Sequence, residues 1–316
     1  MDHLGELAAI GTSFLFSITS IVFTFSGREV GSLLTNRARL LFALIFIIVI
    51  HWITFGQPLP FNAAPDRWLV LGISGLIGFV IGDGCLFQAF LLVGPRISML
   101  IMAFAPALSV IFAWLFLGES LSLPELVIIS VILAGIAWVV SERPPSASTS
   151  SAAANDEALP DEITSKRDSR QRVIGLLFAL GASIGQAGGF ILSKVGLAND
   201  FPALSGTLIR LAAAFVAIWL VAIVRGELKS SATALKTHAR ALRFILLGSF
   251  VGPVLGVWLS LIAVQRSSVG VSSTLSSLAP IFLIPISLVV FHEKISRRAI
   301  IGTIVVIAAT AVLFLQ

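Results

Sequence analysis

The sequence predicts an all-α integral membrane protein with ten transmembrane helices, arranged as two inverted five-helix repeats. Three observations lead to this fold class. Apolar residues make up 57% of the chain and charged residues only 12%, whereas soluble domains carry about 25% charged residues. Ten apolar stretches approach the roughly 17 to 25 residues that a helix needs to cross a bilayer. The second half of the chain also repeats the first at a constant offset of 174 residues.

The ten predicted spans divide evenly about a polar segment. They lie at approximately residues 6–25, 39–57, 68–93, 97–118, 123–140, 173–193, 204–224, 243–264, 269–291 and 298–315. The residues before the first span include no Lys or Arg, and a cleaved signal peptide would need a basic start. We therefore expect the first span to be retained as a helix.

The polar segment separates two predicted domains. Residues 141–172 begin Ser-Glu-Arg-Pro-Pro-Ser-Ala-Ser-Thr-Ser and contain almost nothing apolar to bury, so they are predicted to form a flexible linker. Residues 1–140 and 173–316 are the two five-helix repeats. Because an odd number of spans makes the two halves enter the membrane from opposite sides, the repeat is predicted to be inverted, as in many secondary transporters.

The duplication is visible in residues that are costly in an apolar helix. Pro106 is followed by Glu119, and Pro280 by Glu293, at the same spacing in the two halves. The other matches without a gap pair Gly78, Gly82, Ser98 and Ser122 with Gly252, Gly256, Ser272 and Ser296. An internal duplication in so hydrophobic a chain is typical of a secondary transporter.

The basic residues predict the orientation in the membrane. Of the 21 Lys and Arg residues, all but four are assigned to the loops after the odd-numbered spans, including Arg37 and Arg39. The opposite side holds Arg67, Lys194 and Arg266. Because cytoplasmic loops are enriched in Lys and Arg, the linker is predicted to be cytoplasmic and both termini to lie outside the plasma membrane.

The repeated motif resembles a known family. The pattern Ala-Pro-x12-Glu, followed by a short serine-containing turn and another apolar span, occurs at 105–122 and again at 279–296. The first copy ends Phe-Leu-Gly-Glu-Ser-Leu-Ser and resembles the EamA domain of the drug/metabolite transporter superfamily. The resemblance implies two such domains, export or uptake of a small metabolite, and counterpart roles for Arg39 and Arg210, which match an arginine that often opens the second helix.

Asp83 is the first candidate site residue. A carboxylate at the centre of a bilayer costs about 2.5–3.5 kcal/mol, so its side chain is expected to face a cavity or a partner. Gly82 and Gly84 flank it, while the corresponding position of the second half holds Val257. One interpretation is a hydrogen-bonded acid that holds two helices together. The other is a group that binds a proton or a cationic part of the substrate.

Four further residues complete the predicted substrate or ion site. Arg210 is the basic residue inside a span, where it either binds substrate or extends its side chain toward the membrane surface. Gln88 and Gln186 are uncharged polar residues suited to line a cavity. Trp258 follows the position that corresponds to Asp83.

Pro106 and Pro280 are predicted hinges. A proline within a helix removes one backbone hydrogen bond and frees the carbonyl four residues earlier, here at Met102 and Ser276. Such a break persists in a membrane where neighbouring helices, hydroxyl groups or a wet cavity satisfy the freed carbonyl. The alternative is a packing kink without a functional role.

The sequence argues against several other functions. Cys85 is the single cysteine, the four histidines are scattered, and no phosphate-binding loop occurs, so we expect no metal, no cofactor and no direct use of ATP. The net charge of +5 is explained by topology rather than by nucleic acid. The expected partners are a small-molecule substrate, the lipid bilayer and, as a candidate coupling ion, the proton.

Two alternatives to a transporter stay open. A membrane protein with a structural or receptor role has no distinguishing motif in sequence. An intramembrane serine protease would use Ser74 or Ser183, which lie in short glycine-serine strings, with His51 as the base. Neither string has the strand-turn-helix context of a hydrolase, and a protease predicts no inverted duplication. We therefore expect a transporter and no enzyme activity.

Overall fold

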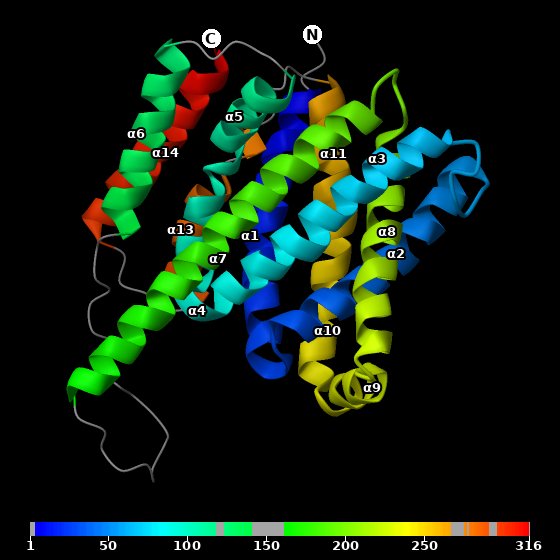
Figure 1. Ribbon diagram of the computed structural model, residues 1–316, viewed down its shortest axis with the longest axis horizontal. Helices are drawn as coiled ribbons and strands as arrows, with labels where there is room; N and C mark the ends of the chain where they lie inside the picture. The colour runs from blue at the N-terminus through cyan, green and yellow to red at the C-terminus, as the bar shows by residue number, and fades with distance from the viewer. Residues whose placement is uncertain are drawn as a thin grey trace.

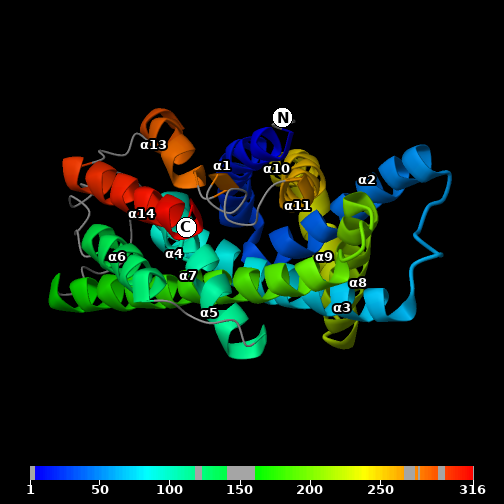
Figure 2. The ribbon, with the colours of Figure 1, turned by 90° about the horizontal axis from the view of Figure 1, so that it is seen from above.

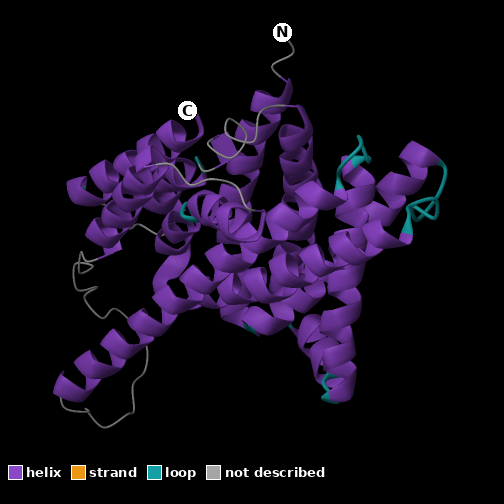
Figure 3. Cartoon of the chain, turned by 45° about the horizontal axis from the view of Figure 1, so that its top comes forward, coloured by secondary structure: helices purple, strands orange, loops and turns teal. Residues whose placement is uncertain are grey.

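The computed structural model describes residues 4–117, 123–140, 161–266, 275–276, 278–290 and 296–315, and within them all regular structure is helical (Figure 3). The first half contains α1 (Leu4–Val30), α2 (Ser32–Phe55), α3 (Pro65–Gly75), the π-helix η1 (Leu76–Gly82), α4 (Asp83–Met102), α5 (Ala105–Leu117) and α6 (Leu123–Val140). The second contains α7 (Asp161–Gly196), α8 (Ala203–Val224), α9 (Leu228–Thr237), α10 (Ala239–Ser249), the π-helix η2 (Phe250–Gly256), α11 (Val257–Arg266), α13 (Ala279–Val290) and α14 (Arg297–Leu315). The predicted all-α class is confirmed for the described residues.

Six helical segments are long and apolar enough to cross a membrane. They are Leu4–Val30, Ser32–Phe55, Pro65–Met102, Ser169–Gly196, Ala203–Val224 and Ala239–Ala263, and three shorter apolar helices accompany them. One of the six, Pro65–Met102, covers parts of two predicted spans. Gly94 interrupts it with a φ of 81°, a conformation that favours glycine, and Pro95 follows. The prediction of a membrane protein is confirmed, while the full set of ten spans stays a prediction.

The start of the second predicted span is corrected from residue 39 to Ser32. The second helix begins at Ser32, so Arg37 and Arg39 are buried inside α2 and do not belong to a loop. Their burial is possible because each pairs with a carboxylate, Arg37 with Glu227 at 2.5 Å and Arg39 with Asp83 at 2.6 Å. The predicted orientation, which rests on the remaining Lys and Arg residues, stays a prediction.

The linker prediction is corrected in its last part. Residues 161–172 are helical and open α7, whereas 141–160 lie outside the described residues. Their sequence, Asp-Glu-Ile-Thr-Ser-Lys-Arg-Asp-Ser-Arg-Gln-Arg, contains Glu, Lys, Arg and Gln, which favour helix, and it places two acids at the helix N-terminus. A polar composition therefore extends a helix here.

The internal repeat is present in the structure down to the helix boundaries. α3 and α10 are 11-residue helices, and each leads into a seven-residue π-helix, η1 or η2. The first residues of η1 and η2 are Leu76 and Phe250, and the last are Gly82 and Gly256, which keeps the predicted offset. π-helical turns are rare in proteins, and those that occur often lie at functional sites.

The first helix of each half packs against the opposite half. α1 contacts α10, η2, α11 and α13, while α7 contacts α3, η1, α4 and α5. α2 and α8 lie side by side at one end of the molecule, and α6 and α14 pair at the other (Figures 1 and 2). Because of this exchange, the two halves interlock and share their central packing.

Small residues let α7 approach the first half very closely. A Cβ atom added to Gly185 would lie 2.7 Å from the Cα atom of Gly82, and one added to Gly189 would lie 3.1 Å from the Cα atom of Gly78. The backbones of α7 and η1 are therefore in direct contact, as small-residue stripes allow in membrane helices.

We expect Gly185→Ala to destabilise the protein by about 1–3 kcal/mol, because backbone atoms that cannot move aside meet the new methyl group. The measurement is the Tm of the detergent-solubilised protein. Gly188→Ala is the matched control on the same helix, since its Cβ would meet only a side-chain atom of Ile77 at 3.5 Å. Equal Tm values for the two variants would contradict the close contact.

Candidate functional site

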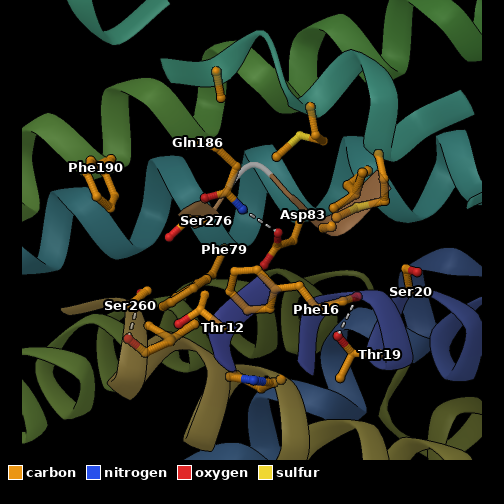
Figure 4. Close-up of a pocket in the computed structure, with 18 of the residues that line it drawn as sticks. Thr12, Phe16, Thr19, Ser20, Phe79, Asp83, Gln186, Phe190, Ser260 and Ser276 are labelled. Carbon is orange, nitrogen blue, oxygen red and sulfur yellow. Dashed lines mark hydrogen bonds between the residues drawn. The ribbon is translucent and has the colours of Figure 1, made fainter. Parts of the chain in front are cut away.

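A cavity of about 210 Å³ lies where the two halves meet. It is lined by residues of α1, α2, η1, α4, α5, α7 and α8, together with residues of η2, α11 and α13. The walls are largely apolar, with six phenylalanines: Phe16, Phe23, Phe79, Phe87, Phe90 and Phe190. Figure 4 shows its polar groups, with Asp83 and Gln186 facing each other and the hydroxyl residues Thr12, Thr19, Ser20 and Ser260 on other walls. Small-molecule sites commonly combine apolar walls with a few such polar groups.

Asp83 is the first residue of α4, directly after η1, and its side chain is buried. Its two carboxylate oxygens each accept a hydrogen bond. Arg39 of α2 donates to Oδ2 at 2.6 Å. Gln186 of α7 donates to Oδ1 at 2.8 Å, a bond drawn as a dashed line in Figure 4. The carboxylate therefore joins three helices and is matched in charge by Arg39.

The π-helix η1 helps to hold Arg39. The backbone N–H of Asp83 bonds to the carbonyl of Gly78, so the Phe79 carbonyl, its partner in an α-helix, is released from that bond. Asn36 of α2 donates to the Phe79 carbonyl at 3.1 Å, and its Oδ1 accepts a bond from Arg39 Nε, also at 3.1 Å. The shifted backbone pairing thus orients the arginine that pairs with Asp83.

Arg210 of α8 enters the same cavity and is only 3% exposed. Its guanidinium lies over the Phe79 ring, 4.7 Å from the centroid, and that of Arg39 lies 5.7 Å from the same centroid. Within the described part of the chain, Arg210 Nε has no hydrogen-bond partner and Arg210 forms no ion pair. The side chain lies inside the protein and does not extend toward the membrane surface.

The structure brings together only some of the predicted site residues. Asp83, Gln186 and Arg210 all line the cavity. Gln88 is not among the lining residues and accepts a hydrogen bond from Ser32 at 2.6 Å instead. Trp258 is also not among the lining residues and packs against buried core residues, whereas its neighbour Val257 reaches the cavity.

Sequence reasoning missed Arg39 as a cavity residue because it placed this charge in a loop. A signal was available, since Asn36 and Arg39 are three residues apart and share one helix face. Phe79 was also missed, and an aromatic residue in an apolar span gives no such signal. Glu119 and Glu293 lie outside the described residues.

Both predicted hinge prolines line the cavity, and each lies in the first turn of its helix. Pro106 follows an interruption between Met102 and Ala105, and Pro280 lies at the corresponding place in α13. The helix therefore breaks before each proline. The sequence predicts that the carbonyls of Met102 and Ser276 are the ones freed by the prolines. The carbonyls that accept hydroxyl bonds from the other half are instead those of the preceding residues, Ile101 and Leu275.

Serine hydroxyls from the exchanged helices bond to the interrupted backbone. Ser183 of α7 donates to the Ile101 carbonyl at 2.9 Å, and Ser13 of α1 donates to the Leu275 carbonyl at 2.5 Å. Ile101 and Leu275 are equivalent positions of the repeat. Each half thus supplies one hydroxyl to the broken helix of the other half, the kind of partner that allows a break within a membrane.

The two candidate protease serines have structural partners. Ser74 donates to the Gly189 carbonyl at 2.5 Å, and Ser183 donates to a backbone carbonyl as described above. His51 lies 2.9 Å from Ser205 through Nε2. Neither candidate serine is thus paired with this histidine, so the geometry offers the protease alternative no support.

Both halves of the chain match one protein family. The model of the EamA-like transporter family matches residues 3–141 and 173–315. The chain belongs to the EamA-like transporter family. As an EamA-like protein with two matched regions, it is a membrane transporter of the drug/metabolite transporter type, which confirms the resemblance found in the motif.

The fold of this EamA-like transporter also occurs among solved structures. A crystal structure described only as "Crystal structure of protein" is similar over 98% of this chain and 95% of the other, with a TM-score of 0.59 and 17% sequence identity. At this identity the likeness concerns the fold alone. No curated protein matches the chain in sequence.

In this EamA-like transporter we expect Asp83→Asn to lower the free energy of unfolding by about 3–5 kcal/mol, because the change leaves the Arg39 guanidinium buried without a counter-ion. The double variant Arg39→Met/Asp83→Leu replaces both charges by apolar groups and should recover most of that loss. The measurement is the Tm in detergent. A single variant as stable as the parent would show that the ion pair contributes nothing to folding.

Proposed function

We propose that the protein is a secondary transporter that moves a small metabolite across the plasma membrane by alternating access. The observation that carries this proposal is the pair of hydroxyl bonds to equivalent carbonyls of the broken helices, Ser13 to Leu275 and Ser183 to Ile101. The two bonds link opposite halves, and the residues that follow the two acceptors, Met102 and Ser276, line the shared cavity. In inverted-repeat transporters, access alternates when the halves exchange conformations around a fixed site.

Pro106 and Pro280 are the proposed hinges of this motion. Neither proline has an N–H group to close the preceding turn, so each break costs little to bend. A movement of α1 would act on α13 through Ser13 and Leu275. The equivalent movement of α7 would act on the break before α5 through Ser183 and Ile101.

The proton is the coupling ion that we propose, with Asp83 as its acceptor. Protonation would remove the negative charge of Asp83. Its bond to Arg39 would then weaken, and the cavity would become more positive. An imposed pH gradient should then drive accumulation in liposomes that contain the purified protein, and a protonophore should abolish it. Exchange of substrate without accumulation would indicate facilitated transport instead.

We expect Ser13→Ala and Ser183→Ala to shift the balance between the two access states in opposite directions. Each variant removes the hydroxyl bond to the broken helix of a different half. The reporter is a cysteine at the cavity residue Ser109 in a protein with Cys85 replaced. Labelling by an impermeant maleimide is compared in right-side-out and inside-out vesicles.

Ser249→Ala is the control for these variants, since Ser249 is buried and its hydroxyl bonds to Ile245 within its own helix. Its labelling should match that of the parent. Shifts of the same sign for Ser13→Ala and Ser183→Ala would contradict alternating access through these bonds. If the parent transports no substrate and neither serine variant changes the labelling, a structural or receptor role is favoured.

The proposed topology has the linker in the cytoplasm and both termini outside, on the basis of the loop charges. We expect a cysteine near residue 150, in a protein with Cys85 replaced, to be protected from impermeant reagents in intact cells. It should become reactive after permeabilisation. Ready labelling in intact cells would reverse the orientation.

A further inference from the structure

We propose that the transported substrate is an amphipathic organic monoanion, whose carboxylate or similar head group binds Arg210 while its apolar part packs among the phenylalanines. This inference rests on the proposed transport function and adds the chemical class of the substrate. It also assigns Arg210 the role of head-group site.

The charge of the cavity favours an anion. Among the described residues that line it, the ionisable groups are Arg39, Arg210 and Asp83. The carboxylate bonds directly to Arg39 and Gln186, so its charge is matched by Arg39. Asp83 interacts with Arg210 only through the longer-range electrostatic field. One positive charge is therefore left over in the cavity, and it favours an anion and disfavours a cation.

The hydrogen-bonding state of Arg210 also favours an anionic partner. Its guanidinium is buried, and in the described residues Nε lacks a partner. The Phe79 ring stabilises one face of the Arg210 guanidinium. The N–H donors point outward in the plane of the guanidinium, so the ring does not act as their hydrogen-bond partner. A buried donor without a partner is costly. A carboxylate can accept two parallel bonds from the planar fork of a guanidinium, which removes this cost.

The surrounding backbone provides space for this arginine. A Cβ atom at Gly75 would collide with the backbone carbonyl of Arg210, and one at Gly78 would lie 3.2 Å from its Nη2 atom. Two glycines of one helical run therefore give room to the backbone and to the guanidinium of the same residue. Arg210 is held before any ligand binds, which reduces the ordering cost of binding.

The remaining walls indicate the rest of the ligand. Phenylalanines from α1, α4 and α7 line the cavity together with Met99 and Met102. The faces of aromatic rings carry partial negative charge, so they accept apolar groups and disfavour a second anionic group. The volume of about 210 Å³ is below the usual range for drug-sized ligands. The preferred ligand is thus small, with one charged end and one apolar end.

The test compares three probes of nearly equal shape on the full-length protein in detergent: 3-phenylpropionate, 3-phenylpropanol and 3-phenylpropylammonium. Binding is measured by calorimetry and by the increase in Tm, since a ligand of the native state raises apparent stability. We expect the carboxylate to bind about tenfold or more tightly than the alcohol. The ammonium ion should bind most weakly. Equal binding of the three probes, tighter binding of the ammonium ion, or no binding of the carboxylate would overturn the proposal.

Variants then test the assignment to Arg210. Arg210→Gln should remove the preference for the carboxylate over the alcohol, and Arg210→Lys should retain part of it because the charge stays while the fork is lost. Arg225→Gln, at the exposed end of the same helix, is the matched control and should bind like the parent. An unchanged preference in Arg210→Gln would overturn the assignment. Should that variant fail to fold, the lysine variant and the three probes on the parent still decide the question.

The two levels of the proposal fail differently. Selective binding of the carboxylate without its uptake into proteoliposomes would remove the transport function and leave the anion site in place. Uptake of a neutral or cationic probe that is insensitive to Arg210→Gln would leave the transport function and remove the anion site.

Discussion

The ion pair between Asp83 and Arg39 is the interaction on which the cavity depends. It places two opposite charges in an apolar interior, where either alone would be very costly. Gln186 adds a bond from the opposite half, so one carboxylate connects the two repeats. Asn36 extends this arrangement to the π-helix before Asp83, because it bonds to the Phe79 carbonyl and to Arg39. With these two charges matched, Arg210 is left to define the chemistry of the cavity.

The two halves share a register but differ in the side chains that fill it. Gly78 meets Gly189 of α7, and its counterpart Gly252 meets Thr19 of α1 at 2.9 Å from an added Cβ. Gly256 likewise meets the Phe16 ring, whereas Gly82 meets the backbone of α7. Where α7 presents glycines to η1, α1 presents Thr19 and Phe16 to η2, and both of these residues line the cavity. A duplicated fold has in this way produced an asymmetric site.

Much of the fold could be predicted from the sequence, because hydrophobic length and an internal repeat act over many residues. The offset of the repeat located the equivalent helices, and Asp83, Arg210, Pro106 and Pro280 all line the cavity. The π-helices could not be predicted, since they depend on tertiary contacts rather than on local preference. Arg39 was assigned to a loop because its counter-charge lies 44 residues away, where no local pattern reveals it. The packing faces of Gln88 and Trp258 were equally hidden.

The exchange of the first helices has a consequence for biosynthesis. α1 is translated before α7, and its partners α10, η2, α11 and α13 follow much later in the chain. Until they are made, α1 has only its contacts with α2 and α4 of its own half. Its hydroxyl groups suit that interval, because Thr12, Ser17 and Thr24 bond to carbonyls of their own helix. α7, by contrast, meets partners that are already in the membrane, so the second half is inserted onto an existing template.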